Sequence, residues 1–318
     1  MSTSRLGLGL AALGRPAYIT AGRAADLGPE RSVDALRRLS WEMLDHGYAA
    51  GLRYLDTARS YGRGEEFLAG WLAANPGRND VTVGSKWGYR YVGDWRGDAE
   101  VHEVKDHSLA AFTEQLAQTR ALLGDRLDVY HVHSATLQTG VLDDAELHRA
   151  LAALRESGVR VGVSTSGPDQ AAAVRRALAV SVDGTPLFTS IQSTWNLLET
   201  SVAGALAEAA AAGARVIVKE AVANGRLTPG EPPDSEPVRR AAAVAAELGI
   251  GLDQLATAAA LAQPWAWRVL SGAVTVEQLD SNVAAEKVTL PPGVLDELAT
   301  LAQPAGEYWA ARSRRPWA

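Results

Sequence analysis

The sequence has 318 residues, of which 47% are hydrophobic and 21% charged, and its net charge is −6. These values are ordinary for a globular protein, and the modest negative charge offers no basic surface to nucleic acid. The absence of cysteine excludes disulfides and cysteine-ligated metal centres, and it fits a cytoplasmic protein. No stretch approaches the roughly 18 apolar residues of a membrane span. The apolar run near the N-terminus is interrupted by glycines and does not resemble a signal peptide. We therefore expect neither nucleic acid nor a membrane as partner, and the sequence leaves the oligomeric state open.

Short apolar runs of β type alternate with longer amphipathic segments along the chain. Eight runs predict strands, namely Leu6–Leu10, Arg53–Asp56, Val81–Lys86, Leu127–His133, Val159–Ser164, Phe188–Ser193, Arg215–Lys219 and Trp267–Leu270. Helical spacing of apolar residues begins at Leu36 and again at Leu109, and further helices are expected over 143–156, 168–179, 199–212, 235–248, 252–263 and 275–286. Repeated strand–helix alternation predicts a (β/α)8 barrel, with an open doubly wound sheet as the alternative.

We expect one domain over residues 1–318. The stretch 220–237, rich in glycine, proline and acidic residues, is predicted to be a long loop after the seventh strand. Residues 303–318 lie beyond the last predicted helix and form a C-terminal tail. Functional side chains in a barrel of this kind lie at the C-terminal ends of the strands and in the loops that follow them.

Four polar side chains lie where a functional site is expected. Asp56 ends the second strand, Tyr61 follows it after a short loop, Lys86 ends the third strand, and His133 ends the fourth. Each residue type alone is common at such positions for structural reasons, as a cap, a packed ring or a solvated charge. Because the three strands are neighbours in a barrel, their side chains can converge, and the four together predict a catalytic group.

The chemistry that suits these residues is carbonyl reduction. A phenol titrates near ~10, too high for an efficient acid at neutral pH, and a neighbouring ammonium favours the phenolate. A shift of roughly three pKa units corresponds to about 4 kcal/mol, which Lys86 could supply to Tyr61 in a dry pocket. Asp56 would pair with Lys86, and His133 would donate a hydrogen bond to the substrate oxygen.

The sequence resembles the aldo-keto reductase superfamily from Leu6 to about Leu301. The resemblance rests on Arg53–Gly62, with its Asp-to-Tyr spacing, on Ser85–Gly88 and on Leu127–His133. It implies a (β/α)8 barrel that binds a nicotinamide cofactor and reduces an aldehyde or ketone to an alcohol, or the reverse. The implied catalytic residues are Asp56, Tyr61, Lys86 and His133, with Tyr61 as the general acid and base.

The resemblance also implies a cofactor site, at positions that match the family less closely. The implied cofactor-binding residues are Ser164, Thr165, Gln192, Lys219, Gly225, Arg226, Ser271, Gly272, Thr275, Gln278 and Asn282. Thr165 stands where the family usually has Asn, and Lys219 where it often has a stacking Tyr. Gly272 and Gln278 replace the Lys and Arg that often bind the 2′-phosphate. NADP(H) is favoured because the family prefers it, and NAD(H) is possible. No metal is required.

An aromatic substrate pocket is expected, suited to a bulky or ring-bearing carbonyl or alcohol. Its predicted residues are Trp87, Tyr89, Trp95, Trp195 and Trp309, with Trp317 in the same tail. The tail 303–318 is expected near this pocket, because the resemblance implies a C-terminal segment that closes over the substrate. His131 is expected to be a buried side chain bonded to a barrel Ser or Thr.

Alternatives remain at this stage. His131 and His133 could ligate a metal in a hydrolase barrel, although the other histidines fall outside strand ends. Lys86 or Lys219 could form a Schiff base. A non-catalytic, redox-sensing regulatory barrel is a further alternative. The Gly7-x-Gly9 sequence resembles a dinucleotide-binding fingerprint but lacks the helix and the acidic residue that such a motif requires.

Overall fold

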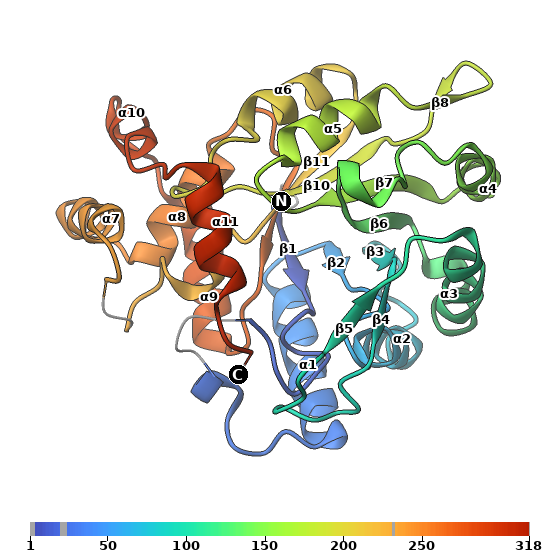
Figure 1. Ribbon diagram of the computed structural model, residues 1–318. Helices are drawn as coiled ribbons and strands as arrows, with labels where there is room; N and C mark the ends of the chain where they lie inside the picture. The colour runs from blue at the N-terminus through green and yellow to red at the C-terminus, as the bar shows by residue number, and fades with distance from the viewer. Residues whose placement is uncertain (1–3, 20–23, 231–232, 318) are drawn as a thin grey trace.

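The computed structural model describes residues 4–19, 24–230 and 233–317. Eight parallel strands close into a barrel in the order β1-β12-β11-β10-β7-β6-β3-β2 (Figure 1). The barrel strands are β1 (Leu6–Gly9), β2 (Tyr54–Asp56), β3 (Thr82–Trp87), β6 (Val129–Ala135), β7 (Arg160–Thr165), β10 (Ser190–Thr194), β11 (Arg215–Lys219) and β12 (Arg268–Ser271). Each matches one of the eight predicted runs, so the predicted (β/α)8 barrel is confirmed and the open sheet is wrong.

Helices surround the barrel. They are α1 (Val33–Ala49), α2 (Gly64–Ala74), α3 (Leu109–Leu123), α4 (Ala145–Glu156), α5 (Gln170–Leu178), α6 (Ala203–Ala211), α7 (Glu236–Glu247), α8 (Leu252–Leu261), α9 (Val276–Ala284), α10 (Val294–Ala299) and α11 (Ala305–Ser313). The six helices predicted by range agree with α4 to α9 to within a few residues. Among the described residues no single helix is long and apolar enough to cross a membrane, and only the bent pair α7–α8 passes that test jointly.

Two additions to the barrel shape its opening. An antiparallel hairpin of β4 (Tyr89–Tyr91) and β5 (Glu103–Lys105) follows β3. The other addition is the C-terminal tail, 303–318. The sequence analysis placed this tail beyond the last helix, which is wrong because the tail contains α11 (Figure 1). Beyond α11, Trp317 forms an isolated antiparallel bridge with Ile19. Residue 318 of the tail and residues 231–232 of the predicted loop 220–237 lie outside the described residues.

Close packing inside the barrel depends on glycines. A Cβ at Gly162 would lie 2.2 Å from the Ser190 carbonyl oxygen and 2.6 Å from Cδ2 of His131. The missing side chain leaves room for the His131 ring, whose Nε2 lies 2.8 Å from Ser190 Oγ. The expectation of a buried His131 with a Ser or Thr partner is thus confirmed, and burial lowers the pKa of His131 to about 3.

Candidate active site

The C-terminal ends of the barrel strands surround one cavity of about 320 Å³, within the range usual for ligand sites. Asp56 at the end of β2, Tyr61 in the following loop and His133 in β6 all line it. Lys86, in β3, lies directly behind Tyr61 and is 1% exposed. The four residues that the sequence places at strand ends therefore meet at one point.

A chain of hydrogen bonds links three of these side chains. Lys86 Nζ donates to Asp56 Oδ2 at 2.5 Å, to the Thr57 carbonyl at 2.9 Å and to the Tyr61 hydroxyl at 3.3 Å. The ammonium therefore has a partner for each of its three hydrogens. Gln192 Nε2 donates to the other carboxylate oxygen of Asp56 at 2.8 Å, which fixes that carboxylate from the opposite side.

The pKa of the Tyr61 hydroxyl differs from the sequence-based expectation. Burial raises this pKa well above its usual range, the charge of Asp56 raises it further, and Arg15 opposes the rise. The lowered pKa expected from Lys86 is therefore wrong for the free protein, because the effect of burial on this pKa exceeds the opposing effect of Arg15. Tyr61 is a neutral phenol at neutral pH, which is the form that can donate a proton.

His133 faces Tyr61 across the cavity. Its ring lies edge-on to the Tyr61 ring, with centroids 5.5 Å apart, and its Nδ1 is 3.4 Å from Ser60 Oγ. Burial and the charge of Lys86 lower the pKa of His133 well below its usual range. The imidazole is therefore neutral, with one nitrogen engaged by Ser60.

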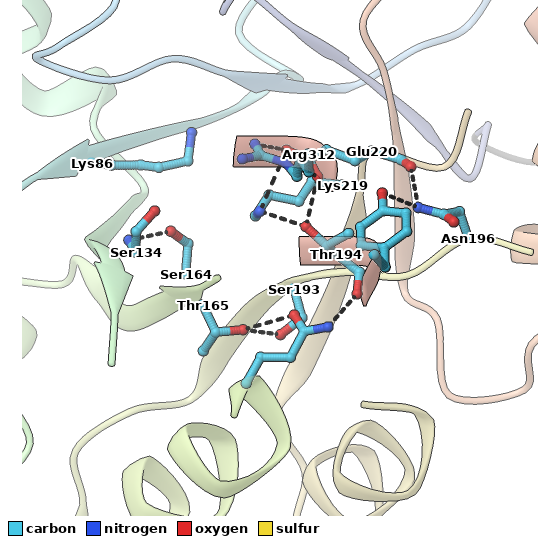
Figure 2. Close-up of polar contacts among 12 residues, drawn as sticks. Lys86, Ser134, Ser164, Thr165, Ser193, Thr194, Asn196, Lys219, Glu220 and Arg312 are labelled. Atoms are coloured by element: carbon cyan, nitrogen blue, oxygen red, sulfur yellow. Dashed lines mark hydrogen bonds and ion pairs between the residues drawn. The ribbon is translucent and has the colours of Figure 1, made fainter. Parts of the chain in front are cut away.

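Seven of the predicted cofactor residues line the same cavity, namely Gln192, Lys219, Gly225, Ser271, Gly272, Gln278 and Asn282. The other four have different partners. The Ser164 hydroxyl accepts from the Ser134 amide at 2.8 Å, and the Thr165 hydroxyl lies 2.7 Å from Ser193 Oγ (Figure 2). The Arg226 guanidinium donates to Asp234 at 2.6 Å.

The fourth, Thr275, caps α9, and its hydroxyl accepts from the backbone N–H of Gln278 at 3.3 Å.

Three residues around the cavity have positive φ without being glycine, namely Ser134 at 53°, Glu220 at 59° and Asn224 at 55°. Such costly backbone conformations tend to occur at functional sites.

Sequence reasoning missed an ionic network at the cavity wall. Lys219 Nζ donates to Thr194 Oγ1 at 2.7 Å, and that hydroxyl donates to Glu220 Oε2 at 3.0 Å. Arg312, on α11, donates to the same Glu220 oxygen at 3.0 Å (Figure 2). Burial lowers the pKa of Lys219 to about 8. Burial would raise the pKa of Glu220, but the Arg312 and Lys219 cations lower it to about 2.

Most of the aromatic side chains predicted to line a substrate pocket lie elsewhere. Tyr89 does line the cavity, with its ring centroid 5.0 Å from that of His133. Trp87 is completely buried against Phe112, with ring centroids 5.1 Å apart. Trp95 donates from its indole nitrogen to the Arg31 carbonyl at 2.9 Å.

The two remaining predicted tryptophans also pack away from the cavity. Trp195 packs on Trp265, with ring centroids 5.9 Å apart, and Trp309 packs on Tyr308 at 5.7 Å. These four tryptophans are corrections to the predicted pocket.

Other aromatic residues line the cavity near Tyr61. Tyr18 and Trp317 both border it, and the buried Arg15 guanidinium lies between them, 5.2 Å and 4.6 Å from their ring centroids. The same guanidinium is 5.0 Å from the Tyr61 ring centroid and donates to Glu103 at 2.7 Å. Trp317 also stacks on His102, with centroids 4.4 Å apart, so the tail contacts the β4–β5 hairpin.

Comparison with known proteins identifies the family. The model of the Aldo/keto reductase family matches residues 5–303. The chain belongs to this family. It is therefore an oxidoreductase that acts on carbonyl compounds.

Individual relatives are more distant. The chain is 27% identical over 290 residues to D-threo-aldose 1-dehydrogenase from a Pseudomonas species, covering 82% of this chain and 87% of that protein. It is 27% identical over 165 residues to norsolorinic acid reductase B from Aspergillus parasiticus, covering 50% and 42%. The fold is similar to the holo form of aldo-keto reductase AKR11C1 from Bacillus halodurans, with a TM-score of 0.70 at 22% identity over 96% of this chain and 94% of that one.

The geometry also bears on the alternative of a metal hydrolase. His131 bonds to Ser190 below the cavity, whereas His133 lines the cavity itself. Within residues 4–19, 24–230 and 233–317, no three histidine, aspartate or glutamate side chains gather closely enough to hold a metal ion. The family assignment favours the oxidoreductase over the hydrolase.

Proposed function

We propose that the protein transfers a hydride between a nicotinamide cofactor and a carbonyl or alcohol, with Tyr61 as general acid and base. The observation that carries this proposal is the hydrogen-bonded series Asp56–Lys86–Tyr61. It ends at the phenol of Tyr61, which lines the cavity beside His133. A buried, neutral phenol bonded to an ammonium can give up its proton when a negatively charged oxygen forms next to it.

The cavity residues fit a nicotinamide cofactor. Gln192 Oε1 is buried beside Asp56 and has no hydrogen-bond partner among the described residues, so it can accept from a carboxamide group. When bound, the cofactor would supply or accept the hydride. Ser271 and Gly272 border the rest of the cavity just before the N-terminus of α9, where free backbone N–H groups favour phosphate, and Asn282 borders it from the last turn of α9.

The chain's own residues perform the proton chemistry. The Tyr61 hydroxyl donates its proton to the carbonyl oxygen as negative charge develops there, and Lys86 stabilises the phenolate that remains. Asp56 holds the Lys86 ammonium in place from a buried position. With Ser60 donating to Nδ1, the neutral His133 presents an Nε2 hydrogen to the same oxygen and orients it. In the reverse direction Tyr61 is the base.

The walls beside Tyr61 favour a polar substrate over the bulky or ring-bearing carbonyl that the sequence suggests. Tyr18, Tyr89 and Trp317 offer ring faces, while Glu220 and Lys219 offer hydrogen-bonding groups in the same cavity. Rings combined with carboxylate and ammonium groups suit a hydroxyl-rich carbonyl such as an aldose. The similarity to a protein named D-threo-aldose 1-dehydrogenase supports this choice.

The decisive experiment is Tyr61→Phe. We expect turnover of an aldose, and of an aromatic ketone for comparison, to fall by about 100-fold or more, because positioned proton transfer typically contributes this much. Cofactor affinity, measured by quenching of tryptophan fluorescence, should remain within a few-fold.

Tyr18→Phe is the matched control, because Tyr18 lines the same cavity but does not contact Lys86. It should retain most turnover. Near wild-type turnover in Tyr61→Phe would contradict the assignment. Absence of turnover in the unmodified protein, with cofactor still bound, would favour the regulatory barrel instead.

A further inference from the structure

Lys219 brings a positive charge into the active site that the ion pairs there do not use. The carboxylates that line the cavity near Tyr61 each have a cation of their own, in the pairs Asp56–Lys86, Glu103–Arg15 and Glu220–Arg312. Lys219 Nζ lies 3.9 Å from the Glu220 oxygen that Arg312 already binds, which is too far for a hydrogen bond. Its charge is therefore in excess.

The protein also leaves most of the hydrogen-bonding capacity of this ammonium unused. Lys219 Nζ donates to Thr194 Oγ1 at 2.7 Å, which is the one hydrogen bond that it makes to the described residues (Figure 2). An ammonium has three hydrogens, so two remain for a ligand. The side chain lines the cavity and is only 16% exposed, so bulk water screens its charge poorly.

Lys219 lies beside the place that the proposed function gives to the nicotinamide ring. In the register of β10 and β11, Gln192 pairs with Ile217 and Thr194 pairs with Lys219. Alternate side chains of a strand point the same way, so Lys219 extends into the barrel mouth one layer above Gln192. A ring whose carboxamide binds Gln192, and whose hydride reaches a carbonyl held by Tyr61, lies in the field of this ammonium.

The effect of this charge extends across the cavity. Burial lowers the pKa of His133, and the charges of Lys86 and Lys219 lower it further. His133 faces Tyr61 from β6, whereas Lys219 belongs to β11, three strands away in the barrel order. A positively charged group between them would be disfavoured in the same way.

We propose that Lys219 makes the site bind the reduced nicotinamide more tightly than the oxidised one. The inference rests on the proposed hydride-transfer function. The oxidised ring carries a positive charge and the reduced ring carries none, so the ammonium repels only the oxidised form. With an effective dielectric constant of about 20, two like unit charges roughly 10 Å apart weaken binding about 10-fold. In a mixed pool of both forms, the protein would be loaded with the hydride donor.

The test is a set of titrations of the purified protein with NADH, NAD+, NADPH and NADP+, followed by tryptophan fluorescence. Both members of a pair share the same adenosine moiety, so the ratio of their dissociation constants isolates the charge of the ring. We expect the oxidised form to bind about 10-fold more weakly than the reduced form of the same pair. Equal affinities would overturn the inference and leave the proposed function intact. Binding of none of the four would overturn both.

Lys219→Met keeps the length of the side chain and removes its charge. We expect this variant to bring the ratio of the two dissociation constants close to one. A merely structural role would weaken both forms alike and leave the ratio unchanged, which would contradict the inference. Lys219→Arg should retain the ratio. Lys287→Met, at an exposed lysine that ends η5 (Ala285–Lys287), is the charge-matched control and should also retain it.

The pH gives a second measurement that needs no variant. Burial lowers the pKa of Lys219 to about 8, Glu220 and Asp56 oppose this change, and Arg312 and Lys86 add to it. The ammonium therefore loses its proton between pH 7 and pH 9.5, and the ratio in the unmodified protein should fall toward one over this range. In Lys219→Met the ratio should stay constant. A ratio that does not change with pH in the unmodified protein would overturn the inference.

Discussion

Acid should destabilise the folded protein partly through one buried imidazole, that of His131. An unfolded histidine titrates near 6.5, whereas burial lowers the pKa of folded His131 to about 3. Between these values the unfolded chain binds a proton that the folded chain does not, so stability is complete above pH 6.5 and is lost as the pH falls toward 3. The loss is about 1 kcal/mol per pH unit, or about 2 to 3 kcal/mol between pH 7 and pH 4.5.

Urea unfolding at pH 7 and pH 4.5 measures this loss, and His131→Gln removes the titrating group. We expect the variant to be less stable at pH 7, since it disturbs the packing around Gly162 and Ser190. On acidification the variant should lose about 2 to 3 kcal/mol less of its free energy of unfolding than the unmodified protein does, because all other titrating groups are shared.

Ser190→Ala provides the matched control for this difference. It removes the hydrogen bond to His131 Nε2 but keeps the imidazole in the barrel. We expect a loss of about 1 kcal/mol at both pH values, with the dependence on pH retained. If His131→Gln lost as much stability on acidification as the unmodified protein, burial of a neutral His131 would not be a source of acid sensitivity, and the reasoning would fail.

Two further predictions concern ion pairs at the cavity wall. Arg15→Met leaves the Glu103 carboxylate, 17% exposed, without its cation and should cost about 3 kcal/mol in urea unfolding. The double variant Arg15→Met/Glu103→Gln should recover at least half of this lost free energy of unfolding. A double variant no more stable than Arg15→Met would contradict the prediction. Arg312→Met removes a cation that lowers the pKa of Lys219, so this pKa should rise above about 8. NMR of the 13C-methylated lysine measures it, and an unchanged or lower value would contradict the prediction.

The sequence predicts the barrel and the four strand-end residues because both follow from local periodicity. Most residues of the parallel strands are buried, and short apolar β-type stretches mark each strand in the sequence, so all eight could be located. Asp56, Lys86 and His133 end such runs, and neighbouring strands in a barrel bring their ends together. These predictions needed no knowledge of distant contacts.

Trp87, one residue of the predicted aromatic pocket, lies away from the cavity for a reason that strand geometry explains. Side chains alternate across a strand, so if Lys86 points into the barrel, Trp87 must point outward. It does, and packs on Phe112 of α3. The same rule could have excluded Trp87 from the start.

Other features depend on contacts that local sequence does not encode. Helix α11 escaped prediction because Tyr308 and Trp309 are its only buried residues, which gives no helical period. The pair formed by Glu220 and Arg312 joins residues 92 positions apart in the chain. No pattern within either segment indicates the other, so the tail's role in the cavity wall emerges only from the folded structure.

The charged groups around Tyr61 do not balance. Asp56 pairs with Lys86, Glu103 with Arg15, and Glu220 with Arg312, while His133 is neutral. Lys219 lies 3.9 Å from the Glu220 carboxylate that Arg312 already holds, so these groups leave one excess positive charge near Tyr61.

This positive charge favours negative charge on a group that lies beside Tyr61. In the proposed reaction, an oxygen that becomes negative beside Tyr61 develops next to a cation. Because the pKa of Lys219 is about 8, the excess positive charge is present at neutral pH and is lost as the pH rises through that value. We therefore expect the proposed proton donation by Tyr61 to be favoured in neutral and mildly acidic solution.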